Sequence, residues 1–209
     1  VPGQEQVSTV LCQQRGSYVT SLVGYSIRLD RRNDPIRPTR GYYIDLVQDI
    51  AGIGGDVHYV RTELDGGWYW GFTRDFVLSV TGGIGYNEGW NGDSIRISDR
   101  FYKGGNTFRG FENAGIGPRD TLYGDSLGGK FYAIGTIEMT VPTFLPEQYG
   151  IKAAVFTDFG TLGLLDRDAK VDPTTNLPLT TVRDDLGLRA SVGISIFWKS
   201  PMGPLRFDL

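Results

Sequence analysis

The sequence DRFYKGGNTFRGFENAGIGPRD, residues 99–120, lies between two groups of segments in which apolar and polar residues alternate. Its glycines and polar residues are too frequent for a continuous strand, and its four aromatic residues argue against a solvated linker. Arg109 stands near the centre, between Phe108 and Phe111. A guanidinium keeps its charge and offers five donors in a fixed fork, so an arginine partly removed from water needs a carboxylate partner. We therefore expect Arg109 to anchor this loop to another part of the chain.

The flanking segments follow the two-residue period of a β-strand. In residues 131–141, for example, Ile137 and Met139 share the apolar side. Thr136 and Glu138 share the polar side. About eight segments of roughly ten residues show this pattern, which is the length of a tilted strand that crosses a bilayer. They cover approximately residues 19–29, 41–50, 57–70, 76–86, 130–141, 151–159, 186–198 and 205–209.

The polar faces and the connections favour a membrane barrel over a soluble β-sandwich. Glycine, serine and threonine dominate many polar faces, whereas a soluble sandwich has shorter strands and a more varied outer face. Short connections at 71–75, 142–149 and 199–204 alternate with long ones at 89–129 and 163–185, as in outer-membrane barrels. The early connections fit less well, because 30–40 is longer than 51–56. Aromatic residues near the strand ends suit interfacial girdles, namely Tyr25, Tyr42, Trp68, Trp70, Tyr86 and Trp198.

Composition excludes several classes of function. The 209 residues carry a net charge of −3 and no basic run, so a nucleic-acid partner is not expected. The chain has one cysteine, Cys12, and one histidine, His58. These counts rule out a disulfide framework within the chain and multi-cysteine or clustered-histidine metal sites. No apolar run is long enough for a transmembrane helix. The glycines on either side of Ile84 superficially resemble a phosphate-binding loop, but no helix-forming segment follows them, so we expect no cofactor site there.

Two carboxylates are the candidate partners of Arg109. Glu138 and Asp158 lie on the polar parity of the segments that follow the loop, so both are expected to point to the polar face. A loop folded onto that face would place Arg109 between them. The pattern alone favours the other interpretation, in which both carboxylates are hydrated and Arg109 lies on the loop surface. A carboxylate pair can also serve glycoside hydrolysis, but an arginine between the carboxylates explains them without catalysis, and we expect no enzyme.

The loop closely resembles the one that carries the Arg-Gly-Phe/Tyr motif in BamA-type outer-membrane assembly factors. The resemblance extends to LGGKFYAIGTIEMTVPTFLPEQYGIKAAVFTDFGTLG and FWKSPMGPLRFDL, at residues 127–163 and 197–209. Upstream, LDRRNDPIRPTRGYY at residues 29–43 resembles a family turn before a barrel strand. The resemblance implies an antiparallel transmembrane β-barrel, of which residues 1–209 supply about strands eight to fifteen of sixteen. It also implies that the POTRA domains, the first strands and the last strand lie outside this chain.

The resemblance assigns roles as well. It implies that the loop at 89–129 enters the barrel lumen, that Arg109 pairs with Asp158 near Glu138, and that Gly110 and Phe111 shape the loop tip. The implied function is the folding and insertion of β-barrel proteins into the bacterial outer membrane. The implied partners are outer-membrane lipid, unfolded barrel clients and accessory assembly lipoproteins. A polypeptide-secretion transporter of the same superfamily and a passive porin-like channel are the alternatives.

Overall fold

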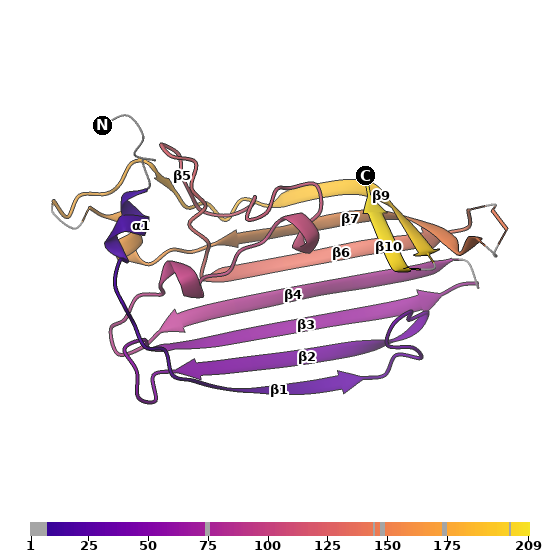
Figure 1. The fold of residues 1–209 in the computed structure, drawn as a ribbon, viewed down its shortest axis with the longest axis horizontal. Helices are drawn as coiled ribbons and strands as arrows, with labels where there is room; N and C mark the ends of the chain where they lie inside the picture. Colours follow the sequence, from indigo (N-terminus) through magenta and orange to yellow (C-terminus); the bar gives the residue numbers. More distant parts are fainter. Residues whose placement is uncertain (1–7, 74–75, 144, 147–148, 173–174, 201) are drawn as a thin grey trace.

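The computed structural model describes residues 8–73, 76–143, 145–146, 149–172, 175–200 and 202–209. Eight strands form one antiparallel sheet in the order β1-β2-β3-β4-β6-β7-β9-β10, so each strand pairs with the next long strand of the chain (Figure 1). Their bounds are β1 Leu22–Asp30, β2 Arg40–Ala51, β3 Tyr59–Gly71, β4 Val77–Gly89, β6 Phe131–Val141, β7 Ile151–Gly163, β9 Arg189–Ser200 and β10 Gly203–Asp208. The predicted all-β architecture and its eight strands are confirmed.

The pairing register gathers the apolar side chains on one face of the sheet. Tyr42 of β2 lies opposite Trp68 of β3, and Trp68 in turn lies opposite Val80 of β4. The same alignment holds across the second half, where Val155 of β7 pairs with Ile194 of β9. These side chains are exposed although they are large and apolar. A continuous exposed apolar face of this extent marks a surface that is covered by lipid or protein.

The opposite face is polar, and its environment changes across the sheet. Every residue of β1 is exposed, so both faces of this strand are open. In β7, by contrast, every second residue from Ala154 to Leu162 is buried, and the residues between them are intermediate or exposed. The buried positions of β7 lie under residues 90–130, which cross in front of β6 and β7 in Figure 1.

The two ends of the sheet differ in the length of their connections. Residues 31–39, 72–76, 142–150 and 201–202 join strands at one end, at the right of Figure 1. Residues 52–58, 90–130 and 164–188 join strands at the other end, where α1 (Thr9–Gln13) also lies. From β3 onward this division matches the predicted alternation of short and long connections, whereas 31–39 is longer than 52–58, as the sequence indicated. Below, the first end is called the short-turn end and the second the long-loop end.

The structure corrects two details of the prediction and adds a third. The sequence before residue 17 shows no clear period and reads as a polar loop, but residues 9–13 form α1, and Val10 packs into an apolar cluster with Leu127. Leu186 and Leu188 were expected in a strand, but β9 begins at Arg189 and both leucines are exposed in the preceding connection. The two long connections also pair with each other through β5 (Arg119–Asp120) and β8 (Val182–Arg183). None of the described helices is long and apolar enough to cross a membrane.

Glycines in the strands leave room for aromatic rings of neighbouring strands. A Cβ atom added to Gly85 of β4 would overlap the ring of Tyr132, which lies opposite it on β6. A Cβ atom at Gly67 of β3 would likewise overlap the ring of Tyr43 on β2. Such a ring covers the bare backbone of its cross-strand glycine, a device that fixes register and permits curvature.

Candidate functional site: the anchored loop

The central connection, residues 90–130, folds back over the polar face of the sheet. Two short 3-10 helices, η1 (Ile97–Asp99) and η2 (Gly105–Thr107), keep it compact. An apolar cluster joins it to the strands, formed by Phe101, Phe108 and Ile116 of the loop with Tyr132 of β6 and Leu162 of β7. All five side chains are almost fully buried. The loop is therefore packed on the sheet and is not a solvent-exposed connection.

Arg109 lies on this face and is held by Asp158 of β7. The Asp158 carboxylate accepts from the guanidinium twice, from Nε at 2.8 Å and from Nη2 at 2.6 Å. It also accepts from the Arg109 backbone N–H at 3.0 Å and from the Thr136 hydroxyl at 2.7 Å. A bidentate guanidinium–carboxylate pair is among the strongest polar contacts in proteins. Because the backbone N–H joins it, this carboxylate fixes the main chain of the loop as well as its side chain.

Glu138 of β6 supplies the second carboxylate. Its Oε2 accepts from Arg109 Nη1 at 2.8 Å and from Arg206 Nη2 of β10 at 2.9 Å. Arg206 also donates to Asp208 at 2.8 Å, and the Asp208 carboxylate lies 3.7 Å from Arg109 Nη1. Arg109 of the loop and Arg206 of β10 thus alternate with three carboxylates, one each from β6, β7 and β10. The loop arginine is the centre of an ion-pair network that ties these strands together.

The network is largely removed from water. The side chains of Arg109 and Asp158 are only 10% and 5% exposed, and that of Glu138 is 15% exposed. The Arg109 guanidinium lies 3.4 Å from the ring centroid of Phe156, which covers its face. Taking these charges out of water is costly, and the cost is recovered only if every partner is present. Loss of one partner would leave an unpaired charge in a poorly hydrated site.

The residues after Arg109 explain the shape of the loop tip. Gly110 has φ +80°, a left-handed backbone that glycine adopts without strain. A Cβ atom there would come within 2.9 Å of the Ser191 Cβ on β9, so the loop approaches this strand closely. Phe111 packs edge-to-face on Phe108 at 5.2 Å and joins the apolar cluster beneath the loop. The structure therefore brings Arg109, Asp158 and Glu138 together and places Gly110 and Phe111 at the tip.

A second anchor was not anticipated from the sequence. The Lys103 Nζ lies 3.7 Å from the ring centroid of Tyr132, and the Tyr132 hydroxyl donates to Glu63 of β3 at 2.8 Å. Arg61, the residue that donates to the other oxygen of Glu63, covers the ring of Phe101 at 4.4 Å. The polar parity of Arg61 and Glu63 was visible in the sequence. Their contact with this loop was not, because it requires the loop to cross from β7 to β3.

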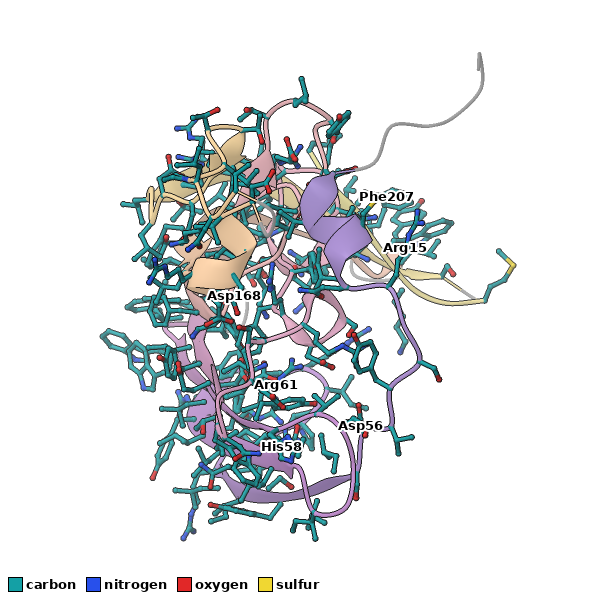
Figure 2. All side chains as sticks on the ribbon, turned by 90° about the vertical axis from the view of Figure 1, so that its left-hand side faces the viewer. Arg15, Asp56, His58, Arg61, Asp168 and Phe207 are labelled. Carbon is teal, nitrogen blue, oxygen red and sulfur yellow. The ribbon has the colours of Figure 1, made fainter. Side chains whose placement is uncertain are left out.

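Further ion pairs join the two long connections at the long-loop end. Lys130 Nζ lies 2.7 Å from Asp166 and 2.9 Å from Glu88. Burial alone would lower the pKa of the Lys130 amine, but these two hydrogen-bonded carboxylates hold that pKa above its ordinary value. Figure 2 views this end and shows Asp168 on the turn η4 (Arg167–Lys170). The loops thus form one packed layer.

The single histidine, the single cysteine and the acidic residues of the second long connection do not form a second centre in the part of the chain that the structure describes. His58 Nδ1 lies 2.7 Å from Asp93, and its ring packs edge-to-face on Trp90. Cys12 is exposed on α1. Asp166 and Asp168 of the second long connection have different partners, because Asp166 binds Lys130 and Asp168 accepts a hydrogen bond from Ser94. Within the described residues, no group of three histidine, cysteine or acidic side chains could hold a metal ion.

Comparison with known proteins identifies the family. The family model described as the Omp85 superfamily domain matches residues 3–209. The chain belongs to the Omp85 superfamily. The anchored loop is thus a feature of an Omp85 barrel wall, in which the apolar face meets lipid and the polar face lines the lumen.

Relatives of this Omp85 chain are found in bacteria and in eukaryotes. It is 39% identical over 195 residues to the outer membrane protein assembly factor BamA of Neorickettsia risticii, covering 93% of this chain and 25% of that protein. It is 35% identical over 152 residues to the sorting and assembly machinery component 50 homolog of Homo sapiens, covering 70% of this chain and 32% of that protein. The chain therefore spans about a quarter to a third of the length of these relatives.

A solved structure shares the fold. The crystal structure of BamA from Haemophilus ducreyi lacking POTRA domains 1-3 matches with a TM-score of 0.76 and 24% identity. The match covers 90% of this chain and 38% of that one. The Omp85 chain is accordingly a segment of an antiparallel transmembrane β-barrel of the bacterial outer membrane.

Proposed function

We propose that the protein containing this chain folds and inserts β-barrel proteins into the bacterial outer membrane. The observation that carries the proposal is the anchored loop, in which Asp158 binds both the backbone and the guanidinium of Arg109. The bacterial relatives are named outer membrane protein assembly factors, and the human relative is named for sorting and assembly. Both observations support assembly of other barrels.

The proposed mechanism is mechanical and involves no catalysed covalent step and no cofactor. The loop holds β6, β7 and β10 in one arrangement through the ion pairs of Arg109, so this part of the wall resists deformation. The partners are then outer-membrane lipid and unfolded barrel clients, whose strands are taken up by main-chain hydrogen bonding. Accessory assembly lipoproteins complete the proposed set of partners. The proposed set of partners does not include nucleic acid, because the chain has a net charge of −3.

The test is a reconstitution of the full-length protein in lipid vesicles. An unfolded outer-membrane barrel protein is added, and its folded fraction is followed by heat-modifiable gel mobility. We expect wild-type protein to accelerate folding over empty vesicles and Arg109→Ala to lose most of this acceleration. Arg28→Ala is the matched control. It removes the same charge from the uncovered strand β1, where Arg28 is 53% exposed and its closest carboxylate oxygens are 3.8 Å away.

Other outcomes would overturn the proposal. Steady large conductance without any acceleration of client folding would identify a passive channel. Export of one secreted polypeptide, with no effect on barrel clients, would identify a secretion transporter. Equal activity of Arg109→Ala and Arg28→Ala would show that the anchored loop does not carry the function.

A further inference from the structure

The connection between β1 and β2 is unusually rich in arginine. Residues 30–40 read DRRNDPIRPTR and contain four arginines and two aspartates. The connection lies at the short-turn end of the sheet, which faces the periplasm in outer-membrane barrels. A positive charge at that level lies close to the headgroups of the adjoining lipid leaflet.

Both aspartates of this turn are already engaged within it. The Asp30 carboxylate accepts from Arg32 at Nε and Nη2, at 2.9 and 2.7 Å. Asp34 Oδ1 accepts from the backbone N–H groups of Ile36 and Arg37. The Asn33 side chain closes the turn by accepting from the backbone N–H groups of Thr39 and Arg40. The turn is therefore built by its own side chains, and its four arginines outnumber its two aspartates, so residues 30–40 keep a net charge of +2.

Two of those arginines continue the lipid-facing rows of their strands. Arg31 follows Leu29 at the two-residue spacing that keeps a side chain on the same face. Arg40 precedes Tyr42 at the same spacing. Arg31 and Arg40 are exposed, and among the described residues neither side chain has a hydrogen-bond or ion-pair partner. A charged residue in a lipid-facing row is stable only where it reaches the headgroups.

An aromatic row marks the level of the headgroups beside these arginines. Trp70 of β3 lies directly opposite Arg40, and its ring packs on Trp68 at 5.7 Å and on Phe72 at 4.3 Å. All three rings are about half exposed. Tryptophan gathers where the hydrocarbon meets the polar headgroups. Arg40 is therefore placed at the phosphate level and not in the hydrocarbon core.

A groove adjoins Arg40 at the same place. Its volume is about 540 Å³, and it is lined by Asn33, Thr39, Arg40, Gly71 and Thr73. The Arg40 guanidinium lines this groove beside the Thr39 hydroxyl, which accepts from the Asn33 amide and keeps its own proton to donate to a phosphate oxygen. A guanidinium binds phosphate through two parallel hydrogen bonds.

We propose that this turn is a binding site for an anionic phospholipid of the periplasmic leaflet. Arg31 and Arg40 bind the phosphodiester, the groove receives the polar headgroup, and the aromatic row of Trp68, Trp70 and Phe72 contacts the start of the acyl chains. The site is separate from the loop network around Arg109, because Arg31 and Arg40 continue the lipid-facing rows of β1 and β2, whereas the network lies on the polar side of β6, β7 and β10. It therefore does not depend on the proposed assembly function.

The test measures lipid binding to the detergent-solubilised full-length protein by native mass spectrometry. Phosphatidylglycerol is the anionic probe and phosphatidylcholine the neutral one. An arginine near an anionic lipid contributes about five-fold in binding, so Arg31→Gln and Arg40→Gln together are expected to weaken phosphatidylglycerol binding about 25-fold. Arg40→Lys keeps the charge and is expected to retain most of the binding.

Lys152→Gln is the matched control. It removes one positive charge from the same end of the sheet. Lys152 has the opposite parity to Ala153 of the apolar row, so its side chain belongs to the lumen face. Its binding of phosphatidylglycerol is expected to equal that of the wild type. Unchanged heat-modifiable mobility of each variant shows that the barrel is folded.

The proposal is overturned if the double variant binds phosphatidylglycerol as well as Lys152→Gln does. Equal binding of phosphatidylglycerol and phosphatidylcholine by the wild type would overturn it without any variant. Displacement by inorganic phosphate at equal concentration would identify a site for free phosphate. Retention of an acidic periplasmic protein, lost in the double variant while lipid binding stays the same, would identify a protein surface in place of a lipid site.

Discussion

Strands β1 and β7 have the same alternating pattern but lie in different surroundings. In β1 every residue is exposed, whereas in β7 every second residue from Ala154 to Leu162 is buried. The difference comes from residues 90–130, which cover the polar side of β7 and leave that of β1 open. A polar residue such as Asp158 therefore belongs to a buried network, while Arg28 of β1 is hydrated. The alternation of a strand determines which face a side chain occupies but not what covers that face.

The largest effect is expected from breaking the Arg109–Asp158 pair. Arg109→Ala leaves Asp158 buried without its charge partner, which should cost roughly 3–5 kcal/mol. Thermal unfolding of the full-length barrel measures this cost. In a double-mutant cycle, adding Asp158→Ala to Arg109→Ala should cost little more than either change alone. Independent, additive losses would show that the pair does not hold the loop.

A smaller effect is expected at Gly110. Gly110→Ala imposes a left-handed alanine, which costs about 1–2 kcal/mol, and also drives a methyl group against Ser191. Gly124→Ala is the control, because Gly124 has φ +76° but no atom within 4 Å of an added Cβ. The difference in unfolding temperature between the two variants isolates the close approach to β9. Ser191→Gly should restore part of the loss in Gly110→Ala, and no restoration would contradict this contact.

The second anchor sharpens the comparison between covered and open strands. Lys103→Met removes the cation over the Tyr132 ring but keeps most of the side-chain volume, and it should cost about 0.5–2 kcal/mol. Tyr132→Phe keeps the ring and loses the hydrogen bond to Glu63. Hydrogen exchange of the backbone amides of residues 101–105 is expected to rise in the lysine variant. Unchanged exchange there would show that the loop does not depend on this anchor.

The smallest effect is expected on the open strand. Arg28→Ala removes a side chain that is 53% exposed and lies 3.8 Å from its carboxylate neighbours. Exposed ion pairs of this kind contribute about 0–1 kcal/mol, so the unfolding temperature should hardly change. A loss as large as that of Arg109→Ala would mean that β1 is covered in the full-length protein by a segment outside this chain.

The sequence was sufficient for the sheet and for the partners of Arg109, because both depend on alternation and on a recognisable loop. Parity alone placed Glu138 and Asp158 on the polar face, and the resemblance selected the pairing. The sequence was insufficient to predict the second anchor, because the contact of Lys103 with Tyr132 depends on the path of the loop in space. The helix α1 was also missed, because five residues carry too weak a helical period and Val10 is fixed by packing against Leu127.

The glycine–aromatic pairs of the sheet also have a consequence for sequence variation. Gly85 can be replaced by a larger residue only if the ring at Tyr132 is removed, and that change would also remove the hydrogen bond to Glu63. The two positions are thus expected to covary among related chains, with glycine at one accompanying an aromatic residue at the other. The same coupling is expected between Gly67 and Tyr43. Single substitutions at either member of such a pair should therefore be rarer than paired ones.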